Sequence, residues 1–339
     1  MMRRIVMPLA LFAVATLAAP APAQALEEII ITQPVDSLSF FPVYVARTLK
    51  YFEAEGLKPR VLSTSGGGPH LQAVLSGKAQ FTASPGNYQL NALKSGQKLV
   101  AVIDLLNRCI IGVVMNKDTA QRVGLKPSMS FERKIKLLKG LTLGITRPGA
   151  LTDSMARQLL LMAGYKAGQD ARVLGVGGAS TIVPALENHK IDVMFISTPH
   201  PERAIGGGFG VWLVNNAKGE NPRLREFMMA ELMTTPEYIE SHPETVQKVV
   251  RVMKRSLDYI HSHSTEDIVK TVEPFFGKRV KPALLKASVE TVKPATSRDG
   301  RLTEAELATT VQLLRESGRD IPDLKLEDVF TDRFLAAVH

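Results

Sequence analysis

Two arginines and a few aromatic side chains are the residues of this 339-residue chain best suited to recognising a small ligand. Arg108 and Arg147 each carry a planar guanidinium group, which holds a carboxylate or sulfonate through two hydrogen bonds. A surface ion pair is the alternative for each arginine. Phe40 and Tyr88 offer rings for stacking, and His70 is able to donate to an anion or to serve as a solvated cap residue. Together these side chains favour a small organic anion, with some aromatic character, as the ligand.

Further candidates lie in six short segments where a predicted strand is followed by a predicted helix. Nearly every segment combines Gly or Pro with Ser or Thr, at residues 36–41, 65–70, 84–88, 146–152, 177–181 and 197–201. In open α/β sheets, ligands bind beyond the carboxyl ends of the strands, where helix N-termini present unpaired N–H groups. Ordinary turn and cap chemistry is the alternative explanation for each segment.

The glycine loop in the second of these segments is not a P-loop. Gly66-Gly67-Gly68 is followed by Pro69 and His70, where a P-loop would carry Lys and then Ser or Thr. Bare main-chain amides in such a loop are still able to hold an oxyanion.

Patterns typical of hydrolytic, redox and metal chemistry are missing from the sequence. It contains no G-x-S-x-G, H-E-x-x-H or C-x-x-C motif, and no G-x-G-x-x-G motif after a strand. Cys109 is the only cysteine and the histidines are scattered singly, so we expect no disulfide, metal site or cofactor. Cys109 precedes an apolar run and is predicted to be a small buried side chain rather than a reactive thiol. We therefore predict binding without catalysis.

The elements that position these residues form two series of alternating strands and helices. Strands are expected at residues 29–31, 61–62, 81–83 and 99–103, and then at 141–145, 173–176, 191–196 and 211–214. Helices are expected at 42–52, from 69, at 152–162 and from about 180. Strands that alternate with helices predict two α/β lobes with parallel sheets. From Thr235 the pattern is helical, with predicted capping boxes at Ser241–Glu244 and Thr303–Glu306.

The N-terminus carries an export signal. Residues 1–4 include Arg3 and Arg4, residues 5–19 are almost entirely apolar, and Ala23-Gln24-Ala25 offers a cleavage site. We predict a signal peptide over residues 1–25 and a soluble mature chain, because no later apolar run is long enough to span a bilayer.

The mature chain is basic. Without the two arginines the chain has 40 basic and 33 acidic residues (42 − 2 = 40), a diffuse excess that helps to draw in anions. Nucleic acid is not an expected partner.

Three passages resemble the periplasmic substrate-binding proteins of nitrate/sulfonate/taurine-type ABC importers, a family that includes binding proteins for thiamine precursors. They are FPVYVARTLKYFEAEGL at 41–57, GITRPGALTDSMARQLL at 144–160 with Gly164 after it, and TPEYIESHPETV at 235–246. Residues 186–192 are also similar to the turn before the second-lobe site loop. The match extends over nearly all of residues 28–275.

The resemblance implies a type II periplasmic-binding fold, which is an α/β fold of two lobes with a cleft and a hinge. Lobe one would comprise residues 26–113 and 227–339, and lobe two residues 114–226, with crossings near 112–116 and 226–234. By family position, the cleft would be lined by Ser39, Phe40, Gly67, Gly68, Asn87, Thr146, Gly149, Thr152, Gly178, Ser180 and Ser197. Two loops depart from the family pattern, at 80–86 and 197–202, so sulfonate or nitrate specificity is not transferred.

We therefore expect a periplasmic, monomeric solute-binding component that delivers its ligand to an ABC permease and the ATPase of that permease. The expected ligand is a small organic anion, a sulfonate or carboxylate. The alternatives are a neutral heterocycle such as a thiamine precursor, an exported ligand sensor, and an enzyme similar to pyrimidine-precursor synthases. The enzyme alternative fits poorly, because those enzymes are cysteine-rich and cytoplasmic.

Overall fold

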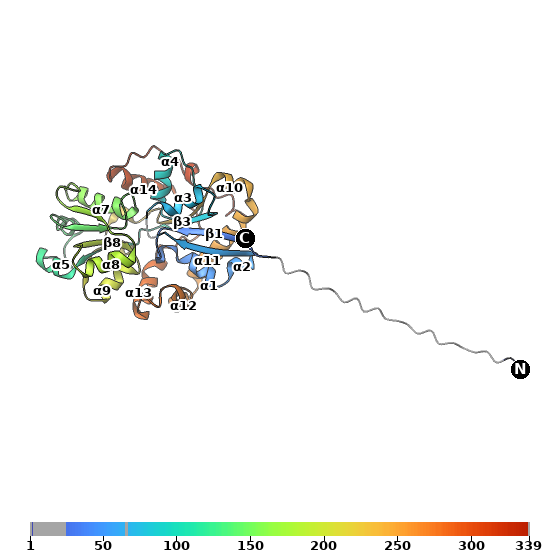
Figure 1. Cartoon of the computed structure of the whole chain (residues 1–339), viewed down its shortest axis with the longest axis horizontal. Coiled ribbons are helices and arrows are strands. Elements are labelled where there is room, and N and C mark those ends of the chain that lie inside the picture. Colours follow the sequence, from blue (N-terminus) through green and yellow to red (C-terminus); the bar gives the residue numbers. More distant parts are fainter. Residues whose placement is uncertain (1, 3–24, 65–66, 338–339) are drawn as a thin grey trace.

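Two lobes, each built on a five-stranded sheet, make up the protein (Figure 1). The computed structural model describes residues 2, 25–64 and 67–337. The predicted signal peptide therefore falls almost wholly outside the described residues. None of the helices in the described ranges is both long enough and apolar enough to span a membrane.

The first sheet has the strand order β2-β1-β3-β10-β4. Its strands are β1 (Glu27–Gln33), β2 (Leu57–Ser63), β3 (Phe81–Ser84), β4 (Val100–Leu106) and β10 (Ala230–Thr234). The second sheet has the order β7-β6-β8-β5-β9. Its strands are β5 (Ile111–Asn116), β6 (Thr142–Ile145), β7 (Arg172–Gly175), β8 (Val193–Ser197) and β9 (Gly210–Asn215).

Both sheets are mixed, so the prediction of parallel sheets is only partly right. In the first sheet β1 runs parallel to β2 and β3, but β10 is antiparallel to β3 and β4. In the second sheet β6 runs parallel to β7 and β8, but β5 is antiparallel to β8 and β9. The antiparallel strands β5 and β10 are those that enter each sheet from the other lobe. Such a strand reaches its sheet from the cleft side, which reverses its direction relative to strands that follow a helix.

The chain passes between the lobes twice, after β4 and after β9. Because β5 already pairs with β8 and β9, the chain joins the second sheet before the predicted boundary between residues 113 and 114. The return crossing ends where β10 begins at Ala230, just after the predicted boundary between residues 226 and 227.

Short helices follow the strands and cover the sheets. Those of lobe one are α1 (Phe41–Thr48), α2 (Tyr51–Ala54), α3 (Pro69–Leu75) and α4 (Gly86–Lys94). Those of lobe two are α5 (Lys117–Val123), α6 (Phe131–Lys136), α7 (Leu151–Met162), α8 (Ala179–Glu187) and α9 (His200–Gly206). The single helix predicted at 42–52 is divided into α1 and α2, because Lys50 adopts a left-handed conformation with φ of 56°. The single-turn 3-10 helix η1 (Leu38–Phe40) precedes α1.

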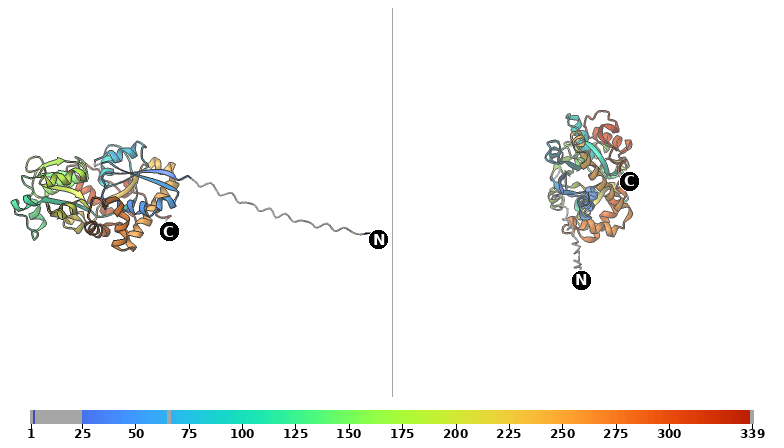
Figure 2. Two further views of the ribbon diagram at one scale, coloured as in Figure 1. Left: turned by 60° about the horizontal axis from the view of Figure 1, so that its bottom comes forward. Right: turned by 90° about the vertical axis from the view of Figure 1, so that its right-hand side faces the viewer.

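The C-terminal helices are α10 (Pro236–Ser241), α11 (Pro243–Ser262), α12 (Thr265–Phe276), α13 (Pro282–Val292), α14 (Glu304–Glu316) and α15 (Leu326–Val329). The long helix α11 packs on α1 and β4 of lobe one. Helix α13 contacts α9, and α14 contacts both α4 and α7, so these two helices connect the lobes (Figures 1 and 2). The C-terminal segment is therefore not confined to lobe one.

The two predicted capping boxes have different outcomes. Thr303 and Glu306 cap α14, with the Glu306 N–H donating to Thr303 Oγ1 and the Thr303 N–H donating to Glu306 Oε2. The box at Ser241 is wrong, because Ser241 is the last residue of α10 and His242 is the N-cap of α11. The Ser241 hydroxyl donates instead to the Glu237 carbonyl within α10.

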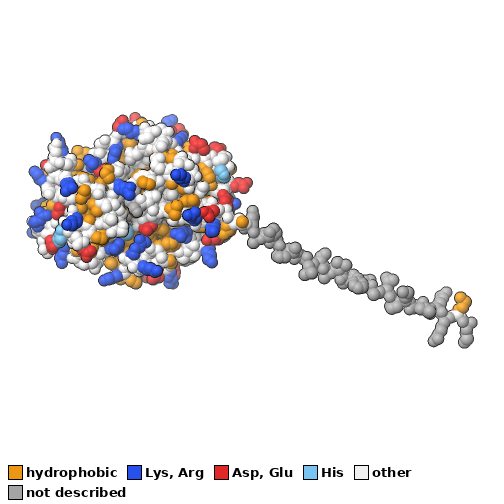
Figure 3. Space-filling model, in the orientation of Figure 1, with side chains coloured by type: hydrophobic (Ala, Val, Ile, Leu, Met, Phe, Trp, Pro, Cys, Tyr) orange, Lys and Arg blue, Asp and Glu red, His pale blue; other side chains and the backbone are white. Residues whose placement is uncertain are grey.

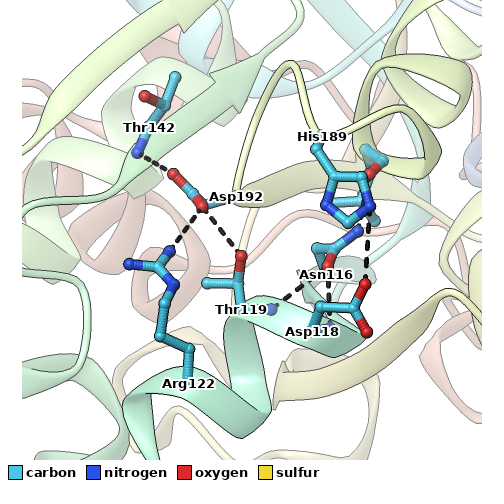
Figure 4. Close-up of polar contacts among 8 residues, drawn as sticks. Asn116, Asp118, Thr119, Arg122, Thr142, His189 and Asp192 are labelled. Carbon is cyan, nitrogen blue, oxygen red and sulfur yellow. Dashed lines mark hydrogen bonds and ion pairs between the residues drawn. The ribbon is translucent and has the colours of Figure 1, made fainter.

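In lobe two, the carboxylate of Asp192, just before β8, connects the start of β6 to α5 (Figure 4). It accepts hydrogen bonds from Thr119 Oγ1 of α5 at 2.9 Å, from the Thr142 N–H at 2.9 Å and from Arg122 at 3.2 Å. Asn116 caps α5 by accepting from the N–H of Asp118. This network attaches α5 to the strands without any residue of the cleft.

Cys109 is fully buried, as predicted, and burial raises the pKa of its thiol to about 12. Charged side chains lie over both lobes, with basic and acidic groups interspersed on the face seen in Figure 3. This distribution agrees with the diffuse basic excess inferred from the sequence.

Candidate ligand site between the lobes

A partly open cavity of about 40 Å³ lies between the two lobes. On this measure one water molecule needs about 10–15 Å³, so the cavity suits a small ligand. Its walls come from both lobes and from the ends of β1, β3, β6 and β8, together with the first residue of β5 and the residue before β10. The lining residues are Pro34, Val35, Ser39, Phe40, Pro85, Tyr88, Ile111, Thr146, Ala150, Leu151, Thr152, Ile196, Ser197 and Met229.

Six of the fifteen predicted site residues line this cavity together. They are Ser39, Phe40, Tyr88, Thr146, Thr152 and Ser197. They meet because the carboxyl ends of parallel strands in each lobe point toward the same cleft, as open α/β sheets require. The two lobes each supply three of them.

Hydroxyl groups are the main polar features of the wall. In lobe two, Thr152 Oγ1 accepts the N–H of Thr146 at 3.1 Å and lies 2.8 Å from Thr146 Oγ1. This pair holds the end of β6 against the first turn of α7. Ser197, the last residue of β8, and Ser39 of η1 add hydroxyl groups from opposite lobes.

Tyr88 connects the wall to a buried polar cluster in lobe one. Its ring meets the His70 ring edge-on, with centroids 4.6 Å apart. His70 Nε2 lies 2.9 Å from Ser84 Oγ at the end of β3. Burial lowers the pKa of His70 to about 4 and raises that of Tyr88, so both rings are neutral at pH 7. His70 therefore supports Tyr88 and does not itself line the cavity.

The two arginines lie outside the cavity wall. Arg147 follows β6 and is exposed, with its Cδ atom against Gly67 of the opposite lobe. Arg108 follows β4 at the first crossing between the lobes and is partly buried. Their positions depend on how the lobes pack, which the sequence pattern did not reveal.

The remaining predicted residues surround the cavity or lie away from it. Gly68 and Gly149 line a second pocket of about 470 Å³, and Tyr88 lines both this pocket and the cavity. Asn87 is fully buried in α4. Gly178 is the N-cap of α8, and Ser180 is exposed on that helix.

Apart from Phe40 and the ring of Tyr88, the apolar part of the wall was not among the predicted site residues. Ala150, Leu151 and Pro85 lie within the strand-to-helix segments, so their position in the sequence was a usable signal. Ile111 and Met229 come from β5 and from the residue before β10, the antiparallel strands that the pattern of alternating strands and helices did not include.

Direct hydrogen bonds hold the lobes together beside the cavity. The Leu38 N–H donates to the Thr198 carbonyl at 2.9 Å, and His200 Nε2 donates to the Asp36 carbonyl at 2.8 Å. Arg319, which follows α14, pairs with Asp153 of α7 at 3.3 Å. These contacts hold the two lobes together around the cavity.

Buried carboxyl groups lie beside the helix N-termini of lobe two. Asp153 is 1% exposed, and its Oδ2 atom accepts the N–H of Gly149 at 2.8 Å. In the first turn of α9, Glu202 accepts from the Thr198 hydroxyl at 3.2 Å. Burial raises the pKa of Glu202 to about 7.

Comparison with known proteins places this architecture in a family. A family model described as NMT1/THI5 like matches residues 37–267, and no curated protein sequence matches the chain at a significant level. Among solved structures, a protein of Bordetella bronchiseptica RB50 superimposes with a TM-score of 0.80 at 22% identity, over 91% of this chain and 96% of that one.

Two further structures share the fold. The alkanesulfonate-binding protein of Xanthomonas axonopodis pv. citri bound to MOPS has a TM-score of 0.68 at 15% identity, over 87% of this chain and 94% of that one. The nitrate-binding protein of Synechocystis PCC 6803 has a TM-score of 0.68 at 10% identity, over 92% and 88%. The two-lobed periplasmic-binding fold implied by the sequence resemblance is thus confirmed, and because the family model covers more than half of its length, the chain belongs to the NMT1/THI5-like family.

Proposed function

We propose that this protein is the extracytoplasmic solute-binding component of an ABC importer, which captures a small molecule between its lobes and delivers it to a membrane permease. The observation that carries the proposal is the cavity with walls from both lobes. A ligand held in this way contacts both lobes at once and is released only when they separate. Such hinge closure couples ligand binding to a change of shape that a permease is able to recognise.

Export and partners follow from the same proposal. The N-terminal residues have the pattern of a signal peptide, which would place the mature chain in the periplasm. An exported sensor that presents its ligand to a membrane receptor would use the same cavity. The cavity wall offers hydroxyl and apolar groups rather than a nucleophile with an adjacent base, which favours binding over catalysis.

The test is a cavity-filling pair of variants on one helix. Leu151 lines the cavity and is 3% exposed, whereas Leu161 lies on the same helix and is 54% exposed. The mature protein, residues 26–339, would be unfolded and refolded to remove carried ligand. It would then be incubated with a soluble metabolite extract of bacterial cells and analysed by native mass spectrometry.

We expect a one-to-one complex with the wild type and with Leu161→Trp, and its loss in Leu151→Trp. Circular dichroism would establish that each variant folds, and Ala150→Leu provides a milder filling of the same wall. Retention of the complex by both filling variants would remove this cavity as the binding site. A wild type that binds nothing from the extract would contradict the proposed function.

A further inference from the structure

We infer that residues 303–328, called the strap below, hold the two lobes closed whether or not a ligand is bound. The strap leaves lobe one, contacts lobe two at its tip and returns to lobe one. It contains α14, which lies between α4 of lobe one and α7 of lobe two (Figure 1). The inference goes beyond the proposed function, because it concerns the balance between open and closed protein and not the ligand.

Both ends of the strap are fixed to the same strand of lobe one. Just before the strap, the Gly300 carbonyl accepts the N–H of Asp104 in β4 at 2.8 Å. Just after it, the Thr331 N–H donates to the carbonyl of Ala101 in β4 at 3.0 Å. The strap is therefore an excursion from the first sheet that begins and ends on β4.

The tip of the strap binds lobe two and the return crossing. The carboxylate of Glu316 accepts from Nε2 of Gln158 in α7 at 2.7 Å, and from Arg223 in the return crossing at 2.5 Å. Arg319 lies 3.3 Å from the carboxylate of Asp153, also in α7. Gln158 and Asp153 are each 1% exposed, so the strap contacts polar groups that are buried in the closed protein.

These contacts favour the closed state because opening would break them. Movement of α7 away from lobe one would separate Gln158 and Asp153 from partners that remain fixed to β4. Hydrogen bonds in which one partner is charged are stronger than those between neutral groups, and each of these contacts includes a charged group. All of the partners belong to the protein, so the contacts form in the closed state without a ligand and raise its population.

The tip keeps its shape through bonds within the strap. Gly318 turns the chain after α14 with a φ of +84°. Arg315 donates from Nε and from a terminal nitrogen to the Ile321 carbonyl, at 3.0 and 2.8 Å, and pairs with Asp323 at 2.7 Å. A tip that is already ordered loses little conformational freedom when it binds α7, which strengthens the contact.

The test measures the distance between the lobes in the ligand-free protein. Lys98→Cys in lobe one and Ser128→Cys in lobe two place spin labels at exposed positions, and Cys109 is buried. The mature protein would be unfolded and refolded to remove carried ligand, and pulsed electron paramagnetic resonance would give the distribution of distances. We expect one main, short distance in the otherwise unchanged protein.

Variants of the tip should open the lobes. Glu316→Ala and Arg319→Ala should each raise the ratio of open to closed protein at least about fivefold, and the double variant should show a clear second population at longer distance. Glu316→Gln retains an acceptor for Gln158 and should open less than Glu316→Ala.

The residue after Arg319 provides the matched control. Asp320 has a 92% exposed side chain and pairs with Lys94 of α4, in lobe one, at 3.4 Å. Asp320→Ala should therefore leave the distance between the lobes unchanged. Circular dichroism would establish that each variant folds, and Arg319→Ala, at a side chain that is 36% exposed, carries the test if Glu316→Ala does not fold.

Two outcomes would overturn the strap. One is a ligand-free protein that is mainly open, and the other is a double variant with the same distances as the protein with an intact tip. These measurements use no ligand, so either outcome would leave the proposed binding function intact. That function fails separately, if the refolded protein binds nothing from the metabolite extract.

Discussion

His200 of lobe two donates from Nε2 to the main-chain oxygen of Asp36 in lobe one, at 2.8 Å. The ring is 2% exposed, and burial lowers the pKa of His200 to about 4, with the charges of Arg203 and Arg279 acting in the same direction. Burial therefore favours the neutral imidazole in this contact, although the hydrogen bond to the Asp36 carbonyl by itself favours the protonated form. Closure buries the ring, and a proton on the ring opposes that burial.

Acid should destabilise the protein through this histidine. In the unfolded chain the imidazole has a pKa near 6.5, so between about pH 6.5 and pH 4 the unfolded state binds more protons than the folded state. Stability is thus lost as the pH falls, by on the order of 2 kcal/mol at pH 5 for His200 and a similar amount for buried His70. Urea unfolding at pH 5 and pH 7.5 measures this loss.

His200→Gln is the matched variant, because its amide retains a donor for the Asp36 carbonyl and does not titrate. Between pH 7.5 and pH 5 we expect the change in stability of the variant to differ from that of the wild type by on the order of 2 kcal/mol, because His200 no longer titrates while the other buried groups titrate alike in both proteins. An equal loss in variant and wild type would show that His200 is not responsible.

A pair of buried acids should make the protein less stable at alkaline pH. Asp104 of β4 and Glu231 of β10 are directly opposite each other in the first sheet, and both are fully buried. Burial, followed by repulsion between neighbouring carboxyl groups that include Glu306, raises the pKa values of Asp104 and Glu231 well above the usual range. The folded state therefore holds protons that the unfolded state releases above about pH 4, and stability falls as the pH rises.

Glu231→Gln should reduce this loss, because the amide has nearly the same shape and no charge. We expect the variant to be more stable than the wild type at pH 8.5 by at least about 1.4 kcal/mol, the equivalent of one pKa unit. The same urea unfolding at pH 5.5 and pH 8.5, with the exposed Glu53→Gln as control, measures it. If the variant lost as much stability as the wild type between pH 5.5 and pH 8.5, Glu231 would not be the cause of the alkaline loss.

The contact between Gly67 and Arg147 across the cleft should appear as an interaction energy. Gly67 has a φ of +77°, and a Cβ atom there would lie 2.8 Å from Arg147 Cδ. Gly77 has a φ of +72° with nothing within 4 Å, so Gly77→Ala measures the backbone cost alone, about 1–2 kcal/mol. Gly67→Ala should cost more than Gly77→Ala.

A double-mutant cycle in urea isolates the side-chain term. In an Arg147→Ala background the extra cost of Gly67→Ala should disappear, because the alanine has no Cδ atom. If the extra cost persists in that background, its origin lies elsewhere in the loop.

Asp153 should be important for the stability of α7 and for its contact with α14. Its carboxylate accepts from Gly149, Arg157 and Arg319 while 1% exposed. Asp153→Asn should cost about 2–3 kcal/mol, since hydrogen bonds to a buried charge are lost or weakened. Asp320→Asn, at a 92% exposed side chain, should change the stability by less than about 0.5 kcal/mol in the same urea unfolding. A small effect of Asp153→Asn would contradict the importance of this buried carboxylate.

Local patterns in the sequence determined much of the architecture. The alternation of apolar strands and amphipathic helices predicted two α/β lobes, because each strand and helix must bury an apolar face. The sequence likewise predicted the capping box of Thr303 and Glu306. It also predicted the apolar stripe of α11, in which Val246, Val249 and Leu257 are fully buried. Gly and Ser or Thr at the strand ends marked Ser39, Thr146 and Ser197, because strand ends and helix starts are local features.

Only the tertiary structure decided which of these residues share one wall. The strands β5 and β10 bring Ile111 and Met229 to the cavity by crossing between the lobes, a long-range pairing without a local sequence signal. The arginines suit an anion by residue type, but the packing of the lobes places the Arg147 side chain against Gly67 and not in the cavity wall. The sequence specifies the residue types. The position of a side chain relative to a cavity depends instead on contacts between segments far apart in the chain.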